Sequence, residues 1–324
     1  MKSFKSFLAP QLKEFLVYRE NLGYAMRAYR FYLLMFDNYI IDAEANINSL
    51  TPEFFLSMRA NLKMEPRSVN RVISTVRMFF RYLIRCGHYT ENPLQDIPLL
   101  KENTIVPFVF SPEQVNQILD AFSKKIRKSK RYFLWDLSLY MCVLLLARCG
   151  LRISEPLKLL HRHYRKDDAT IYIEKTKFKK DRLIPIPKSV VTEIENYLSV
   201  RKKLLPFDQN PYLLASKAQR PLKDNQVRRV FQQVLKDTGL YQPRRILGSV
   251  NFSQPTPHSL RHSFAVNTLV NINKRKESTQ HALPVLAAYM GHSEYKHTSV
   301  YLKVADAISR KRLVDFALWQ KGKE

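Results

Sequence analysis

The sequence predicts a mainly α-helical protein with one small β-hairpin, an α+β fold. Three observations lead to this prediction. Apolar residues recur at helical spacing, and residues 1–100 have the pattern of helices only. Alternation of apolar and polar residues is confined to the stretch between Ala169 and Pro187. Helix-starting patterns, in which a capping hydroxyl precedes a proline and an acid, occur at residues 51–53 and 111–113.

Length and charge indicate two domains and an anionic partner. At 324 residues, two domains are more common than one. The stretch from Pro98 to Pro107 is typical of a linker, so we expect domains over residues 1–100 and 107–324. The net charge is +26, of which residues 101–324 carry +22. Such a field attracts duplex DNA or RNA, although a generally adhesive basic protein would have the same charge.

The clearest helix of the first hundred residues is predicted over Pro66–Cys86. Its apolar residues, from Val69 to Leu83, fall within an arc of about 120°. The opposite face carries five arginines: Arg67, Arg71, Arg77, Arg81 and Arg85. Such a stripe is often just a solvated face. Because no acid interrupts it, we expect it to contact DNA phosphates. Thr51-Pro52-Glu53 predicts the start of another helix.

The second domain begins near Pro107 in this interpretation, and Ser111-Pro112-Glu113 starts its first helix. A buried helix is expected over Tyr132–Ala147, ended by Gly150. Two short strands, 170–174 and 182–186, flank a basic turn that contains Lys175, Lys177, Lys179 and Lys180. Further helices are predicted over Lys188–Leu204, Lys223–Thr238, Pro257–Val270, Pro284–Met290 and the tail from Asp306.

Cysteine usage and the N-terminus point to a reducing compartment. The three cysteines form no CxxC pair, and Cys142 and Cys149 lie in an apolar run. The first residues lack the apolar core of a secretory signal, and the longest apolar run, Tyr140–Ala147, is too short to span a bilayer. We therefore expect a soluble, cytoplasmic protein without membrane contact.

Three short strings carry the chemistry. They are Gly150-Leu151-Arg152-Ile153-Ser154-Glu155, His258-Ser259-Leu260-Arg261-His262, and Met290-Gly291-His292 followed nine residues later by Tyr301. Among their side chains are the phenol of Tyr301, two guanidinium groups and the imidazoles of His258 and His292, a set that suits attack on a phosphodiester without a metal ion. No Cys/His cluster has zinc-ligand spacing, and no grouped acids resemble a two-metal nuclease. We expect no metal and no cofactor.

His258 and Arg261 are predicted to form a phosphate clamp. Thr256 and Pro257 open a helix, which places His258 and Arg261 on one face of its first turn. A helix N-terminus presents free N–H groups and partial positive charge to an anion. The alternative is an ordinary surface histidine and arginine. Arg152 likewise either pairs with Glu155 structurally or is oriented by Glu155 toward a phosphate.

These residues resemble the conserved boxes of the tyrosine recombinases, the phage integrase family. The resemblance extends over about Pro107–Glu324 and includes the nine-residue gap between His292 and Tyr301. It implies that residues 1–100 form the family's core-binding domain. It also places the family's hairpin lysine at Lys177, with Lys175 and Lys179 as rivals. The sequence departs from the family pattern in Pro156 and in a connection, Asn271–His281, that looks longer than usual.

The resemblance implies site-specific DNA cleavage and rejoining through a covalent 3′-phosphotyrosyl intermediate. Tyr301 is then the nucleophile, and a 5′-hydroxyl leaves. The other five catalytic residues are Arg152, Lys177, His258, Arg261 and His292. Lys177 would act as the general acid and His258 as the base, while the remaining three hold the phosphate oxygens. Two alternatives stay open: DNA relaxation of the type IB topoisomerase kind, and a catalytically inactive DNA-binding protein on the same fold.

The expected partners are double-stranded DNA and further copies of the chain. The family implies a tetramer on paired sites, in which the segment after the tyrosine, Val304–Trp319, contacts a neighbouring protomer; a self-packed terminal helix is the alternative. We expect a nucleoid-associated bacterial protein. The long Asn271–His281 connection and the high charge favour a recombinase encoded by a transposon or similar mobile element over one that resolves chromosome dimers.

Overall fold

The computed structural model describes residues 3–174, 181–214, 220–292, 298–299, 301–302 and 304. The chain divides into two compact units, Met1–Thr104 with Gly248–Val250 and Ile105–Leu247 with Asn251–Glu324. Ten α-helices and two three-stranded sheets occur in the described ranges. The predicted fold class, mainly α with small sheets, is confirmed.

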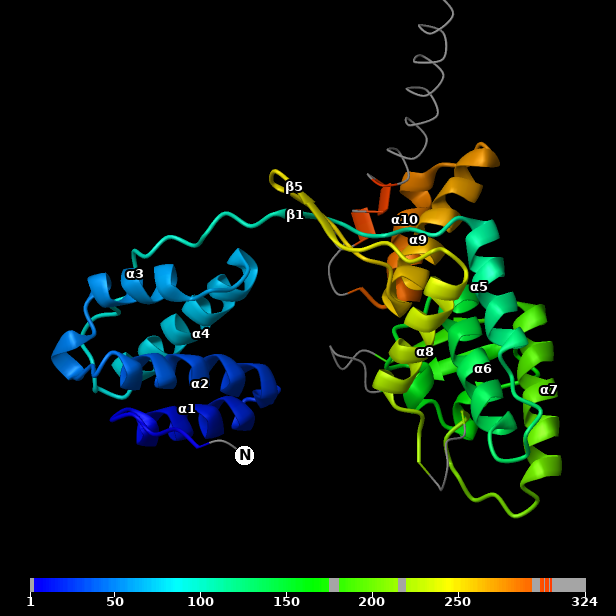
Figure 1. Ribbon diagram of the computed structural model, residues 1–324, viewed down its shortest axis with the longest axis horizontal. Helices are drawn as coiled ribbons and strands as arrows, with labels where there is room; N and C mark the ends of the chain where they lie inside the picture. The colour runs from blue at the N-terminus through cyan, green and yellow to red at the C-terminus, as the bar shows by residue number, and fades with distance from the viewer. Residues whose placement is uncertain are drawn as a thin grey trace, which may run out of the picture. The chain divides into compact units, whose positions relative to one another are not determined.

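The first unit is built from four helices around an aromatic core (Figure 1). They are α1 (Ala9–Asn21), α2 (Met26–Asp42), α3 (Pro52–Asn61) and α4 (Pro66–Arg85). The apolar face of α4 is buried as its periodicity predicted. Phe36, Phe55, Phe79 and Phe80 are fully buried, and their rings meet mostly edge to face. Such aromatic contacts add to the stabilisation from burial of apolar area.

The arginines of α4 divide into two kinds. Arg67, Arg71 and Arg81 are exposed, as expected for a surface that meets DNA. Arg77 is half-buried, and its guanidinium donates hydrogen bonds to the carbonyl oxygens of Leu94 and Ile97 at 2.9 and 2.6 Å. The Arg77 guanidinium therefore holds the segment after α4 against this helix. The exposed Arg85 donates to the Tyr18 hydroxyl.

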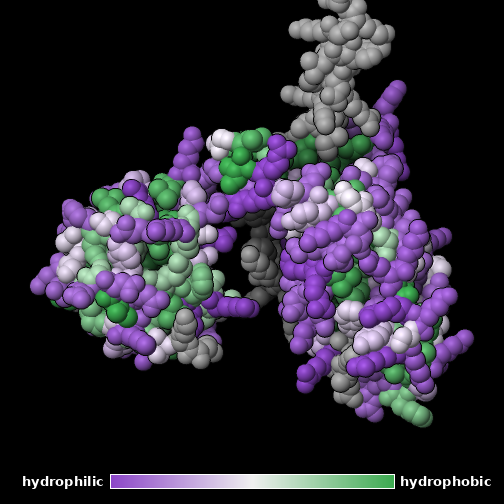
Figure 2. Space-filling view, in the orientation of Figure 1, coloured by the Kyte–Doolittle hydropathy of each residue, from purple (hydrophilic) through white to green (hydrophobic). Residues whose placement is uncertain are grey.

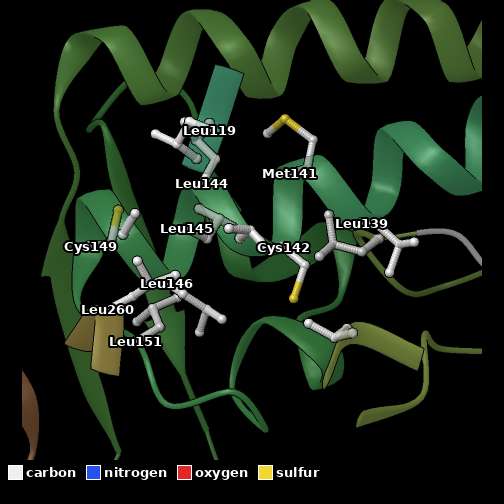
Figure 3. Close-up of a cluster of buried hydrophobic side chains, with 14 of the residues drawn as sticks. Leu119, Leu139, Met141, Cys142, Leu144, Leu145, Leu146, Cys149, Leu151 and Leu260 are labelled. Atoms are coloured by element: carbon white, nitrogen blue, oxygen red, sulfur yellow. The ribbon is translucent and has the colours of Figure 1, made fainter. Parts of the chain in front are cut away.

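The second unit is organised around the buried helix α6 (Phe133–Cys149). The helices around α6 are α5 (Pro112–Lys124), α7 (Lys188–Leu204), α8 (Asp224–Asp237) and α9 (Pro257–Lys274), and α10 (Thr279–Met290) packs against α9. Figure 3 shows leucines of α6 packed with Leu119 of α5, Leu151 and Leu260 of α9. Cys142 and Cys149 are buried free thiols in this core. The core thus fixes the ends of α6 and α9, where two of the motifs lie.

Each small sheet contributes a hairpin. Strands β3 (Thr170–Ile173) and β4 (Arg182–Pro185) pair antiparallel with Ile171 opposite Ile184, and β2 (Tyr164–Arg165) pairs with β3. This hairpin confirms the predicted strands. The second sheet has the order β1-β6-β5, from strands β1 (Thr104–Val106), β5 (Arg245–Leu247) and β6 (Val250–Phe252). It was not predicted, although Gly248-Ser249 between apolar residues is a turn signal.

Two segments depart from the family pattern in sequence. The first is the segment after Gly150. It turns and then forms a short 3₁₀ helix, Pro156–Lys158, opened by the proline that departs from the family pattern. The second is the Asn271–His281 connection, where both flanking helices include more residues than predicted. Helix α9 continues to Lys274 and α10 begins at Thr279, which leaves only residues 275–278 between them.

No helix in the described part of the chain is long and apolar enough to cross a membrane. The predicted tail helix from Asp306 lies outside the described residues. Figure 2 shows that hydrophilic residues cover most of the visible face of the second unit. This distribution agrees with the strong positive charge of residues 101–324.

Candidate active site

Helix α9 presents the first pair of site residues. Thr256 is its N-cap in an extended conformation, Pro257 occupies the first turn, and the Thr256 N–H donates to Ser259 Oγ at 3.0 Å. The helix therefore begins one residue before His258, as the sequence predicted. His258 and Arg261 lie three positions apart, on the same side of this first turn.

Arg261 is almost completely buried, with 1% of its surface exposed. Its guanidinium donates to the carbonyl oxygens of Gly150 and Met290, at 2.8 and 2.6 Å, and contacts His292 Nε2 at 3.2 Å. Burial and the nearby charge of Arg152 lower the pKa of Arg261 to about 10, so it stays protonated at neutral pH. One side chain thus joins all three motifs. Burial of a charged guanidinium costs free energy unless an anion binds next to it.

Two glycines, Gly150 and Gly291, allow the side chains of this site to pack closely against the helix ends. Gly150 and Gly291 each end a helix in the left-handed conformation, with φ of 57° and 64°. A Cβ at Gly150 would lie 2.4 Å from the Phe264 ring, and one at Gly291 would lie 2.9 Å from Arg182 Nη1. Both strain and space therefore favour glycine at these positions. The carbonyl of Gly291 also receives a hydrogen bond from Arg152 Nη2 at 2.7 Å.

Glu155 is the buried acid that organises the arginines. Arg182 binds its two carboxylate oxygens at 3.0 and 2.9 Å, and the Arg152 side chain binds Oε1 at 3.1 Å. Burial acts to raise the pKa of Glu155, but Arg182 and Arg152 outweigh it and the pKa is lowered. The carboxylate is therefore charged. Glu155 therefore forms an ion pair with Arg152 and at the same time fixes the direction of the Arg152 side chain.

Arg182 was not recognised as a site residue from the sequence. It lies on β4 with 9% of its side chain exposed, and its Nε donates to the Tyr289 carbonyl at 2.8 Å. Through Glu155 it ties the strand that follows the basic turn to the helix end at Gly291. An arginine at the start of a strand gave no signal in the sequence, because its partners lie 27 and 107 residues away.

His292 follows the C-terminal glycine of α10. Its Nδ1 lies 2.7 Å from Oγ1 of the buried Thr298. A guanidinium can only donate, so Nε2 of His292 accepts the contact from Arg261 and Nδ1 carries the proton. This arrangement fixes the ring and assigns its tautomer in the protein without DNA.

Tyr301 is buried against these rings, with 4% of its surface exposed. Its ring stacks on His292 with centroids 6.0 Å apart, and its hydroxyl lies 3.1 Å from His262 Nδ1. Burial raises the pKa of Tyr301, and the charges of Arg261 and Arg152 act in the opposite direction. The structure therefore brings Arg152, Arg261, His292 and Tyr301 together.

His258 borders the same site and is exposed. Although His258 is exposed at the edge, the protein packed around it removes part of its hydration; this loss, followed by the charges of Arg261 and Arg152, lowers the pKa of His258 to about 4. Its ring stands 4.5 Å from that of His262. The neighbour His262 belongs to the same sequence string, yet it was given no role from the sequence.

The four lysines of the predicted basic turn, Lys175, Lys177, Lys179 and Lys180, lie outside the described residues. The assignment of Lys177 therefore remains a prediction. Within the residues that the structure covers, no group of three or more His, Cys, Asp and Glu side chains is placed to hold a metal ion.

Comparison with known proteins places this site in a family. The model of the phage integrase family matches residues 109–307. A tyrosine recombinase of Pseudothermotoga lettingae is 30% identical over 75% of this chain and 73% of its own length. The chain belongs to the phage integrase family. The putative integrase/recombinase y4rB of Sinorhizobium fredii is 27% identical over 90% of this chain and 91% of its own length.

The fold also matches a solved recombinase. The XerH site-specific recombinase bound to a palindromic difH substrate matches with a TM-score of 0.67 and 17% identity, over 96% of this chain and 84% of that chain. The resemblance predicted from the motifs is confirmed, and the protein is a tyrosine site-specific recombinase. Family membership favours recombination over the topoisomerase and inactive-platform alternatives.

Proposed function

We propose that Tyr301 attacks the scissile phosphorus of duplex DNA, forms a 3′-phosphotyrosyl ester and releases a 5′-hydroxyl. The observation that carries this proposal is the convergence of the Tyr301 phenol with Arg261 and His292, which are joined at 3.2 Å. The bond energy stays in the ester. A second DNA strand that presents a 5′-hydroxyl can then reverse the step and complete an exchange.

Arg152, Arg261 and His292 are proposed to hold the non-bridging oxygens of the phosphate. Two guanidinium groups fixed by carbonyls and by Glu155 need little reorganisation when charge develops in the transition state. Removal of one such preorganised donor typically costs about 10²–10³ in rate. Arg152 is the more exposed of the two arginines, so we assign it the first contact with incoming DNA.

Proton transfer is proposed to involve His258 and Lys177. A pKa of about 4 makes His258 a weak base in the free protein. A DNA phosphate beside it adds negative charge, which raises the pKa of an imidazole. His258 thus becomes basic enough to receive the Tyr301 proton when the substrate is bound. Lys177 would protonate the leaving 5′ oxygen.

DNA and further protomers are the proposed partners. The second unit and the exposed arginines Arg67, Arg71, Arg81 and Arg85 supply the phosphate-neutralising charge. Solved relatives include a lambda integrase tetramer bound to a Holliday junction. We propose a tetramer on paired sites, in which residues 304–319 contact a neighbouring protomer. We further propose a nucleoid-associated protein that moves a transposon or similar element; cleavage sites mapped in a host genome would then bound a discrete movable segment.

The experiment that tests this chemistry uses a nicked suicide DNA substrate, whose short cleaved strand diffuses away and traps the covalent complex. Wild-type protein is expected to form an adduct in the presence of EDTA. Tyr301→Phe removes only the nucleophilic oxygen and is expected to bind DNA normally without forming an adduct. An adduct that persists in Tyr301→Phe would overturn the assignment. Loss of wild-type cleavage in EDTA, restored by magnesium, would overturn the metal-free mechanism.

A further inference from the structure

His262 contacts the proposed nucleophile but has no part in the chemistry described above. It follows Arg261 in α9, and its Nδ1 lies 3.1 Å from the Tyr301 hydroxyl. The two rings are 5.6 Å apart and inclined at 55°. The distance and the ring geometry fit a direct hydrogen bond between the two side chains. Both residues belong to the same chain.

The surroundings keep His262 neutral. Its ring is half-buried, with His258 on one side at 4.5 Å and with Arg261 and His292 nearby. Burial lowers the pKa of His262 to about 3, and the charges of His258, Arg261 and His292 act in the same direction. The imidazole therefore offers one lone pair and one N–H at any physiological pH.

Tyr301 retains its proton in this pair. Burial holds the pKa of its phenol above the usual value of about 10. A base as weak as His262 cannot remove a proton from so weak an acid to a useful extent. The contact therefore fixes the phenol without activating it, and a separate group must take the proton when DNA is bound.

We propose that His262 is a positioning residue, whose neutral ring holds the Tyr301 hydroxyl in the site of its own chain before DNA binds. The inference rests on the proposed role of Tyr301. A phenol whose rotation is restricted in advance loses less entropy on reaching the attack geometry. In the described residues, the Tyr301 ring packs in an apolar cluster and stacks on His292, while its hydroxyl contacts His262 Nδ1.

Two substitutions separate positioning from proton transfer. His262→Ala removes the hydrogen-bonding group. His262→Asn keeps a polar atom near the place of Nδ1 but cannot accept a proton to become a cation. With single-turnover cleavage of the suicide substrate at saturating DNA, we expect His262→Ala to be slower by about 10- to 100-fold and His262→Asn to recover most of the rate. The shape of the pH–rate profile should be the same in all three proteins.

Each other outcome contradicts the proposal. A loss of about 10²–10⁴ in both variants, with a changed pH–rate profile, would make His262 the general base. A wild-type rate in His262→Ala would show that the contact has no role. If His262→Ala lost DNA affinity or thermal stability to the same extent as it lost cleavage, the role of His262 would be only structural. His281→Ala, at an exposed histidine of α10, is the matched control and is expected to behave as wild type.

Mixed assemblies test whether the contact acts within one chain. Tyr301→Phe protein contains an intact His262, and His262→Ala protein contains an intact Tyr301. When the two are mixed on one substrate, the adduct should stay as slow as with His262→Ala alone. Recovery of the wild-type rate would show that His262 acts on the tyrosine of another chain. An adduct on Tyr301→Phe would instead overturn the proposed function itself, which distinguishes the two failures.

Discussion

Arginines on α4 of the first unit and arginines around Glu155 of the second unit differ in what their guanidinium groups contact. The Arg67 side chain is 54% exposed and its Nε lies 3.6 Å from the exposed Glu102 carboxylate, whereas the Arg182 side chain is 9% exposed and is bound to Glu155 and a carbonyl. Arg261 is buried more deeply still. Exposed cations add affinity for any phosphate, while fixed cations define one position for it. Substitutions in the two regions should therefore fail in different ways.

The largest effect is expected at Arg261. Arg261→Lys keeps the charge, but an ammonium cannot serve two carbonyls and His292 together. Cleavage should fall by about 10²–10³ or more, because a preorganised donor is lost. The unfolding free energy should fall as well, by about 1–3 kcal/mol for each carbonyl left without a donor. Suicide-substrate kinetics and thermal unfolding measure these losses, and near-normal cleavage by the variant would contradict the account.

Glu155→Gln should have the next largest effect. It keeps the shape of the side chain but leaves Arg182 and Arg152 beside a neutral amide. Removing one member of a buried ion pair costs about 3–5 kcal/mol. Glu195→Gln is the matched control, because the Lys166–Glu195 pair is more exposed and should contribute about 0–1 kcal/mol. Chemical denaturation measures both, and similar losses in the two variants would remove Glu155 from its organising role.

Acidification should weaken the second unit. The pKa of His262, about 3, lies below the usual value near 6.5, so the unfolded chain binds more protons than the folded chain between these values. Stability is therefore full above pH 6.5 and declines as the pH falls toward 3. Glu155, with its lowered pKa, adds a loss of the same sign at lower pH. Between pH 7.5 and 5 we expect a loss of about 1–2 kcal/mol from His262.

Thermal unfolding at a series of pH values tests this sign. His262→Gln cannot titrate, so its unfolding midpoint should depend less on pH over this window than that of the wild type. A midpoint that rises as the pH falls from 7.5 to 5 would contradict a depressed pKa at His262.

The smallest effect is expected on α4. Arg81→Gln should weaken DNA binding modestly and reduce the slope of log affinity against log salt by about 1, with cleavage at saturating DNA unchanged. Arg77→Gln should leave the salt slope nearly unchanged and lower stability instead, because two carbonyls lose their donor. Equal salt slopes for these two variants would show that the exposed Arg81 and the carbonyl-bound Arg77 do not differ in their contact with DNA phosphates.

Local patterns predicted much of this molecule. Periodicity predicted α4 and its buried face, and alternation predicted the β3–β4 strands. The cap and proline at Thr256–Pro257 predicted the start of α9. The roles of the motif residues remain proposals, but the strings that carry them do converge in space. Local signals sufficed here because each is read within one or two turns of chain.

Contacts between distant segments could not be predicted in this way. Arg182 looks like an ordinary strand residue until the fold brings it to Glu155. Arg77 looks like a member of a surface stripe until the chain after α4 returns to it. His262 lies 39 residues before Tyr301, and no spacing rule connects them. Pro284 within α10 made the connection between α9 and α10 appear long, although the helix begins before the proline.

The most direct test of the central claim is to identify the residue that becomes linked to DNA. Trypsin cleaves after Lys296 and Lys303, so the peptide His297–Lys303 contains Tyr301 and no other tyrosine. Mass spectrometry of the trapped complex, after nuclease trimming, should find a nucleotide on this peptide, with fragment ions that place it on Tyr301. A nucleotide on the peptide that carries Tyr295, or on any other residue, would contradict the account.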